Sequence, residues 1–169
     1  MRIFLIRHGD AIKKETGIIL TKKGLTQAKK VAKVLSSFPI TKVYVSTATR
    51  TQQTFEPYHK LRANVPFVNT SNIKEIYRTI VGGPPKEGTN PLREKEDKER
   101  IDLFINELHL LSDNENIVLF THGNVIRYYF AKALKFDPKE LWENLIINPG
   151  SISFIERRKD ASYVKMINN

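Results

Sequence analysis

Two short motifs in the sequence place a histidine directly before a glycine: Arg7-His8-Gly9 and Thr121-His122-Gly123. The guanidinium of an arginine is a planar fork of donors that matches the oxygens of a phosphoryl group. A neutral imidazole is a nucleophile that can accept a phosphoryl group on nitrogen. A following glycine lets backbone N–H groups approach a ligand closely. Together with Arg50, these motifs indicate chemistry at a phosphoryl group.

Each of these residues follows a short apolar segment that we predict to be a strand. The predicted strands are Arg2–Ile6, Lys42–Ser46, Val65–Asn69, Ile117–Phe120, Ser151–Glu156 and Tyr163–Ile167. The predicted helices cover 22–37 with Thr21 as N-cap, Thr49 to about Pro57, Leu92–Leu111, Val125–Leu134 and Pro138–Leu145. Alternating strands and helices predict an α/β fold, a three-layer sandwich with a mostly parallel sheet.

In a parallel sheet, ligands bind beyond the carboxyl ends of the strands. We therefore expect Arg7, His8, Arg50 and His122 to meet at one edge of the sheet. A metal site is the competing interpretation of two histidines. Zinc would require a third ligand nearby, and two arginines would repel the cation, so we expect no metal.

The composition favours an anionic partner. The chain has 169 residues, which predicts a single domain over 1–169, and its formal net charge is +10. Such a charge suits nucleic acid, an anionic membrane or an anionic substrate, or it only aids solubility. No basic motif interleaved with aromatic residues is present, so a nucleic-acid partner is disfavoured.

Two absences in the sequence narrow the chemistry and the location. There is no cysteine, which excludes thiol nucleophiles and disulfides and favours a cytoplasmic protein. No apolar run approaches the roughly 18 residues of a membrane span, so we expect no membrane partner. Residues 82–91 hold three glycines and three prolines, which predicts a surface loop or lid.

Several motifs occur in a recognisable order along the chain. They are Arg7-His8-Gly9, Leu20-Thr21-Lys22-Lys23-Gly24, Gln27-Ala28, the stretch from Ser46 to Thr54, and Thr121-His122-Gly123-Asn124. This order resembles the histidine phosphatase superfamily, with its phosphoglycerate-mutase-like fold, from residue 2 to about 156. The extended motif Arg7-His8-Gly9-Asp10-Ala11 is also similar to small bacterial phosphohistidine phosphatases.

The resemblance implies a role for each matching residue. His8 would be the catalytic nucleophile that becomes phosphorylated. Arg7, Arg50 and His122 would form the phosphate pocket with it, and the backbone N–H of Gly123 would be a further donor. The two arginines should disfavour the imidazolium form of His8.

A leaving alkoxide also needs a proton, which a carboxyl group near the pocket can supply. Members of the superfamily carry this carboxyl in a leucine-x-glutamate context after the third strand, and Glu75 fits that place. Glu87 and Asp10 are the alternatives. The glycine- and tryptophan-containing segment that mutases carry after this acid is replaced here by the Gly/Pro loop.

The resemblance implies a phosphatase that hydrolyses phosphomonoesters or phosphohistidine through a phosphohistidine enzyme intermediate, with no metal and no cofactor. The substrate would be an anionic phosphorylated small molecule or a phosphoprotein. Two alternatives are phosphoryl transfer of the phosphoglycerate mutase type and a catalytically silent module that binds a phosphorylated ligand.

Overall fold

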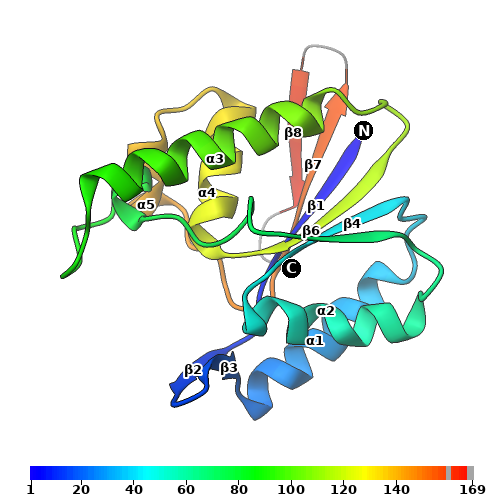
Figure 1. The fold of residues 1–169 in the computed structure, drawn as a ribbon. Helices are drawn as coiled ribbons and strands as arrows, with labels where there is room; N and C mark the ends of the chain where they lie inside the picture. The colour runs from blue at the N-terminus through cyan, green and yellow to red at the C-terminus, as the bar shows by residue number, and fades with distance from the viewer. Residues whose placement is uncertain (159–160, 167–169) are drawn as a thin grey trace.

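A six-stranded sheet forms the middle layer of the computed structural model, which describes residues 1–158 and 161–166 (Figure 1). The strand order is β5-β4-β6-β1-β7-β8. The strands are β1 (Arg2–Arg7), β4 (Lys42–Ser46), β5 (Phe67–Thr70), β6 (Asn116–Thr121), β7 (Ile152–Arg158) and β8 (Ala161–Met166). The first four are mutually parallel, and β7 is antiparallel to both of its neighbours. The mostly parallel sheet is thus confirmed, although Ile167 of the last predicted strand lies outside the described residues.

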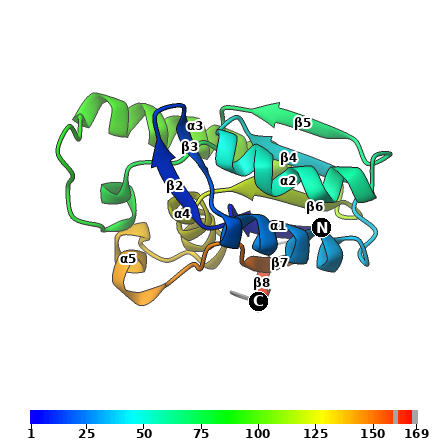
Figure 2. The ribbon, with the colours of Figure 1, turned by 90° about the horizontal axis from the view of Figure 1, so that it is seen from below.

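Helices cover both faces of the sheet (Figures 1 and 2). One face carries α1 (Lys22–Leu35) and α2 (Thr49–Leu61), and the other carries α3 (Pro91–His109), α4 (Gly123–Leu134) and α5 (Leu141–Asn144). Alternating side chains of the central strands fill the two cores. In β1, Ile3 and Leu5 pack with the α3 and α4 layer, whereas Phe4 and Ile6 pack with the α1 and α2 layer. A strand that is buried on both faces has a continuous apolar sequence, which is why β1 could be predicted.

The helix starts follow their capping residues. Thr21 caps α1, and its side chain accepts a hydrogen bond from the Gly24 N–H at 3.0 Å, as predicted. Asn90 caps α3 in the same way, so that helix begins one residue earlier than predicted. The long helix buries Ile101, Phe104, Ile105 and Leu108, whose spacing of three and four residues places them on one face.

Some local structure differs from the prediction. A hairpin of β2 (Ala11–Lys14) and β3 (Gly17–Leu20) follows β1, and Figure 1 shows it at the carboxyl end of that strand. Short 3₁₀ helices occupy η1 (Arg78–Val81) and η2 (Pro138–Glu140), and η2 shortens the predicted last helix to α5. Of the predicted loop at 82–91, residues 82–90 form a loop, whereas Pro91 is the first residue of α3. Among the described residues, no helix is long and apolar enough to cross a bilayer.

Candidate active site

The register of the sheet brings the two histidine motifs together. Arg7 at the end of β1 pairs with Thr121 at the end of β6, so the next residues, His8 and His122, leave the sheet at the same level. The β4 strand lies on the other side of β6, and Ser46 ends it. The predicted convergence at the carboxyl edge of the sheet is therefore observed, because three adjacent parallel strands end there.

His8 is held as a neutral imidazole, and one of its ring nitrogens has no hydrogen-bond partner in the part of the chain that the structure describes. Its Nδ1 lies 2.8 Å from the Gly9 carbonyl oxygen. A carbonyl only accepts, so Nδ1 carries the proton and Nε2 keeps its lone pair. Burial, together with the charges of Arg50 and Arg7, lowers the pKa of His8 to about 4, even though the hydrogen bond to Gly9 favours the protonated ring. The predicted effect of the arginines is confirmed in direction, but burial is the larger cause.

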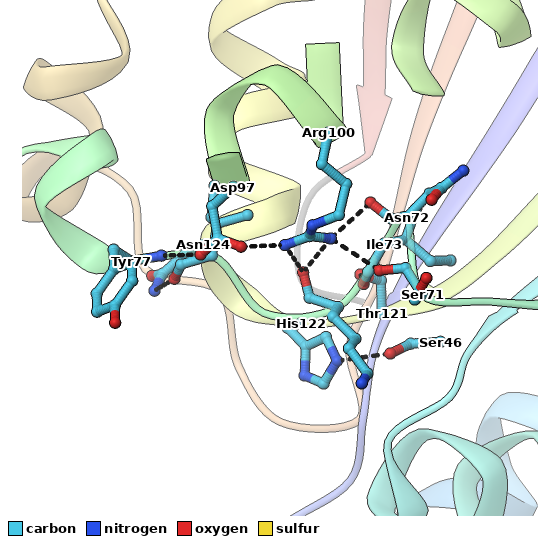
Figure 3. A network of polar contacts seen from close by, with 12 residues as sticks. Ser46, Ser71, Asn72, Ile73, Tyr77, Asp97, Arg100, Thr121, His122 and Asn124 are labelled. Carbon is cyan, nitrogen blue, oxygen red and sulfur yellow. Dashed lines mark hydrogen bonds and ion pairs between the residues drawn. The ribbon is translucent and has the colours of Figure 1, made fainter. Parts of the chain in front are cut away.

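His122 is fully buried and has hydrogen-bond partners at both ring nitrogens. Its Nδ1 lies 2.9 Å from Arg50 Nη2, and its Nε2 lies 3.0 Å from Ser46 Oγ. Arginine only donates, so Nδ1 accepts and Nε2 carries the proton that is donated to Ser46 (Figure 3). Burial, followed by the charge of Arg50, lowers the pKa of His122 to about 2. The centroids of the His122 and His8 rings are 5.3 Å apart.

Arg7 and Arg50 supply the positive charge of the site. Arg50 lies in the first turn of α2, and Arg7 Nη1 donates to the Ile147 carbonyl oxygen. Within the described residues, the buried Arg7 Nε has no hydrogen-bond partner, which leaves a donor for a ligand oxygen. A Cβ built on Gly123 would lie 3.4 Å from that nitrogen, so the start of α4 adjoins Arg7. The unpaired N–H groups at a helix N-terminus favour an anion there.

Glu75 lies beside these residues, in the segment between β5 and η1. Its Oε1 accepts a hydrogen bond from the Asn124 N–H at 3.1 Å. Burial raises the pKa of Glu75 to about 7, although this hydrogen bond and the charges of Arg50 and Arg7 favour the carboxylate. A carboxyl with this pKa exchanges a proton readily near neutral pH.

The other two candidate proton donors have different surroundings. Asp10 Oδ2 accepts a hydrogen bond from Thr21 Oγ1 at 2.6 Å, and the Asp10 N–H donates to Gln27 Oε1 at 2.7 Å. Asp10 is thereby tied to the start of α1. Glu87 is exposed in the loop between η1 and α3. These contacts favour Glu75 over both alternatives.

Close backbone packing holds the segment after β1 in place. A Cβ on Gly9 would lie 2.6 Å from the Gly24 carbonyl oxygen, and a Cβ on Gly24 would lie 2.1 Å from the Asp10 carbonyl oxygen. The Gly9 N–H donates to Thr54 Oγ1 at 3.1 Å, and that hydroxyl donates to the Arg50 carbonyl oxygen at 2.7 Å. The position of His8 is therefore coupled to both α1 and α2.

The sequence interpretation did not include Arg127. Its Nε donates to the Leu145 carbonyl oxygen at 2.8 Å, and its Nη1 donates to Asn124 Oδ1 at 3.1 Å. Burial and the charge of Arg7 both lower the pKa of Arg127, so the two guanidiniums are neighbours. The sequence did contain a signal for Arg127: it lies four residues after Gly123, and residues at that spacing share one face of a helix.

In residues 1–158 and 161–166, no three histidine, aspartate or glutamate side chains form a group that could hold a metal ion. The donors that converge at the site are guanidiniums, imidazoles and backbone N–H groups, which suit an anion.

Comparison with known proteins supports the family that the motifs suggest. The chain matches the profile of the histidine phosphatase superfamily (branch 1) over residues 3–96 and 93–169. A Schizosaccharomyces pombe protein described as a probable phosphatase is 29% identical, over 92% of this chain and 87% of that protein. The mitochondrial serine/threonine-protein phosphatase PGAM5 of Mus musculus is 32% identical, over 94% of this chain but only 59% of that protein.

Solved structures show the same fold. The α-ribazole phosphatase of Shigella flexneri superposes with a TM-score of 0.82 at 19% identity, covering 100% of this chain and 96% of that one. A phosphoserine phosphatase of Entamoeba histolytica gives a TM-score of 0.72 at 20% identity, covering 99% and 96%. The sheet order, the two histidine motifs at adjacent strand ends and the profile match agree. This chain belongs to the histidine phosphatase superfamily and has its phosphoglycerate-mutase-like fold.

Proposed function

We propose that this protein is a phosphatase that hydrolyses phosphomonoesters or phosphohistidine by way of a phosphorylated His8. The observation that carries the proposal is the state of His8. Its Nδ1 is hydrogen-bonded to the Gly9 carbonyl oxygen, its Nε2 has no hydrogen-bond partner within residues 1–158 and 161–166, and its low pKa keeps the ring neutral. Arg7 and Arg50 stand beside this nucleophile as donors for phosphoryl oxygens.

The proposed reaction has two steps. In the first, His8 Nε2 attacks phosphorus, the bond from phosphorus to the leaving oxygen breaks, and protonated Glu75 gives its proton to that oxygen. In the second, Glu75 takes a proton from water, the water oxygen attacks phosphorus, and the phosphorus–nitrogen bond breaks. Inorganic phosphate leaves, and both side chains return to their first state.

The other site residues bind the transferred group in this proposal. Arg7, Arg50 and the Gly123 N–H donate to the phosphoryl oxygens, on which charge develops in the transition state. His122 lies in the same pocket and accepts the hydrogen bond from Arg50 at 2.9 Å, which fixes the orientation of that guanidinium. Ser46 holds the His122 ring through the other nitrogen.

The relatives indicate the range of substrates. Those described above are named as phosphatases of protein serine and threonine, of α-ribazole phosphate and of phosphoserine. We propose a phosphorylated small molecule or phosphoprotein as the substrate here, and the net charge of +10 favours such anionic groups. A nucleic-acid partner stays disfavoured.

The proposal includes one catalytic domain over residues 1–169 that needs neither a metal nor a cofactor. Turnover should therefore continue in the presence of a chelator. A cytoplasmic location stays a prediction from the sequence, and several relatives carry the word mitochondrial in their names.

The deciding experiment combines turnover of p-nitrophenyl phosphate in excess chelator with trapping of labelled phosphate on the enzyme. The variant His8→Ala should lower turnover by about 10³-fold or more and give no labelled enzyme. His109→Ala is the matched control, because His109 is exposed on α3, and it should behave like the wild type. Near-normal turnover by His8→Ala would refute the mechanism.

The same assay separates the alternatives. A mutase would require bisphosphoglycerate and would pass the label to a second substrate instead of to water. A silent module would bind inorganic phosphate but show no turnover in the wild type.

A further inference from the structure

The segment that carries Glu75 has no regular structure of its own. Residues 71–77 run between β5 and η1 as turns, bends and irregular backbone. Within it, Ile73 and Ile76 are buried, with 0% and 2% of their surface exposed. The position of the Glu75 carboxyl therefore depends on what neighbouring elements do to this segment.

Arg100 of α3 binds the first part of the segment through its backbone carbonyls. Arg100 Nη1 donates to the carbonyl oxygens of Ser71 and Asn72, both at 2.8 Å. Both terminal nitrogens of Arg100 also approach the Lys74 carbonyl oxygen, at 3.3 and 3.4 Å. Figure 3 shows this single guanidinium facing the three carbonyls. The planar fork of arginine can make these contacts at once, which a lysine ammonium cannot reproduce.

Asp97, one helical turn earlier on α3, binds the other end. Its Oδ1 forms an ion pair with Arg100 Nη2 at 2.6 Å, and both side chains are 22% exposed. Its Oδ2 accepts a hydrogen bond from the Tyr77 N–H at 3.2 Å. We call these two residues the Arg100–Asp97 clamp. Glu75 lies between the two points at which the clamp holds the chain.

Two further contacts fix the middle of the segment to the site itself. Thr121 Oγ1 donates to the Ile73 carbonyl oxygen at 2.7 Å, and Asn124 Nδ2 donates to the Ile76 carbonyl oxygen at 3.1 Å. Thr121 and Asn124 flank the His122-Gly123 motif. The segment is thus held between α3 on one side and the phosphate pocket on the other.

We infer that Arg100, together with Asp97, is a positioning residue that holds the Glu75 carboxyl beside the phosphate pocket. This inference rests on the proposed function, in which Glu75 is the proton donor. Every hydrogen bond described for Arg100 goes to the Glu75 segment or to Asp97, and none goes to His8, Arg7 or Arg50. Loss of Arg100 should therefore impair proton donation and spare the attack by His8.

Substrates with different leaving groups separate these two effects. A p-nitrophenolate leaves without a proton, whereas an alkoxide such as glycerol needs one. Arg100→Met should lower kcat/KM for glycerol phosphate by about 10- to 100-fold, because a displacement near 1 Å costs that much. With p-nitrophenyl phosphate the loss should stay below about threefold, because no proton is needed. With glycerol phosphate, Arg100→Lys should lose less kcat/KM than Arg100→Met, because a lysine ammonium can replace some of the hydrogen bonds of the guanidinium.

The chain contains a matched control for this variant. Arg157 also donates to two backbone carbonyls, those of His109 and Leu111, and pairs with Asp113 at 3.1 Å. It pairs through its backbone with Met1, at the opposite end of β1 from the site. Arg157→Met should therefore affect both substrates equally. An equal effect of Arg100→Met on both substrates would overturn the inference and show a structural role only.

A double-mutant cycle with Glu75→Gln tests the connection between the two residues. If Arg100 acts through Glu75, Arg100→Met should add little to the loss already caused by Glu75→Gln on glycerol phosphate. Additive losses would overturn the inference while leaving Glu75 as the donor. If Glu75→Gln changes neither substrate, the assignment of Glu75 is wrong, and a selective effect of Arg100→Met would then have another cause.

The measurement does not depend on one variant folding. Thermal unfolding of each protein establishes that it is folded before kinetics. If Arg100→Met fails to fold, Arg100→Lys and Asp97→Asn carry the same comparison. Both should slow glycerol phosphate more than p-nitrophenyl phosphate, and equal effects on the two substrates would again overturn the inference.

Discussion

The variant Glu75→Gln should remove the alkaline limb of the pH–rate profile for an alkyl phosphate. Burial lowers the pKa of His8 to about 4, so the nucleophile becomes neutral as the pH rises through that value. Burial raises the pKa of Glu75 to about 7, so the proton donor is lost as the pH rises further. The profile of kcat/KM should therefore be bell-shaped, with its maximum between these two values.

The burial of Glu75 sets the size of the effect. At pH 7 a glutamate with its ordinary pKa of 4.5 would hold a proton in only about 0.3% of molecules, whereas a pKa of about 7 gives about half. The environment of Glu75 thus raises the amount of the acid form by about two orders of magnitude at neutral pH. Two pH units above its pKa, the wild-type rate should have fallen by about a hundredfold.

The assay compares wild type and Glu75→Gln on glycerol phosphate and on p-nitrophenyl phosphate from pH 4 to pH 9. The substrate phosphate itself titrates near pH 6, which affects both proteins equally. Only the wild type should show the alkaline limb, and only with glycerol phosphate. At the maximum, the variant should be slower on glycerol phosphate by about 10²- to 10⁴-fold, the usual contribution of a general acid.

Two outcomes would refute this reasoning. An alkaline limb that persists in Glu75→Gln would assign the titration to another group. A wild-type rate on glycerol phosphate that stays constant from pH 6 to pH 9 would mean that no acid with a pKa of about 7 takes part.

Three further predictions concern stability and charge. Gly24→Ala should lower the free energy of unfolding in urea by about 3 kcal/mol, because its Cβ would overlap the Asp10 carbonyl oxygen. Gly88 has a φ of +78° and open space around it, so Gly88→Ala should lower the free energy of unfolding by only about 1 kcal/mol. Equal losses in the two variants would contradict the close packing at Gly24. Because the pKa values of His8 and His122 are lowered in the folded protein, the unfolded chain binds more protons below pH 6.5, so the free energy of unfolding should fall as the pH drops from 6.5 to about 4 for His8 and to about 2 for His122. Urea unfolding at pH 7 and pH 5 checks this. The free energy of unfolding should fall less between these two pH values in His122→Gln than in the wild type, and an equal fall would contradict the prediction. If the net charge of +10 steers substrate, kcat/KM for glycerol phosphate should fall with rising salt, whereas a flat dependence would assign the charge to solubility.

Much of the fold could be predicted because its central strands are buried on both faces. Continuous apolar runs such as Ile117–Phe120 have few other interpretations, and parallel strands bring their carboxyl ends together. The predicted meeting of Arg7, His8, Arg50 and His122 followed from that geometry. The β2 and β3 hairpin was missed because its strands are short and half-exposed, with Ile12 and Ile18 open to solvent.

The supporting contacts could not be predicted in the same way. The spacing of Arg127 from Gly123 places it near the site, but no local spacing identifies the distant backbone carbonyls to which Arg100 and Arg127 donate. On the sequence alone, Arg100 is one more charge on a strongly charged helix.

The hydrogen bond between His8 and the Gly9 carbonyl also determines which isomer of phosphohistidine the proposed reaction can form. With Nδ1 occupied, only Nε2 is open to phosphorus, so the distal isomer is the one expected. Because Nδ1 keeps its proton after the transfer, the phosphorylated ring is a cation, and a neutral imidazole departs when water attacks. In the proposed reaction this backbone carbonyl would therefore favour rapid transfer of the phosphoryl group from His8 to water.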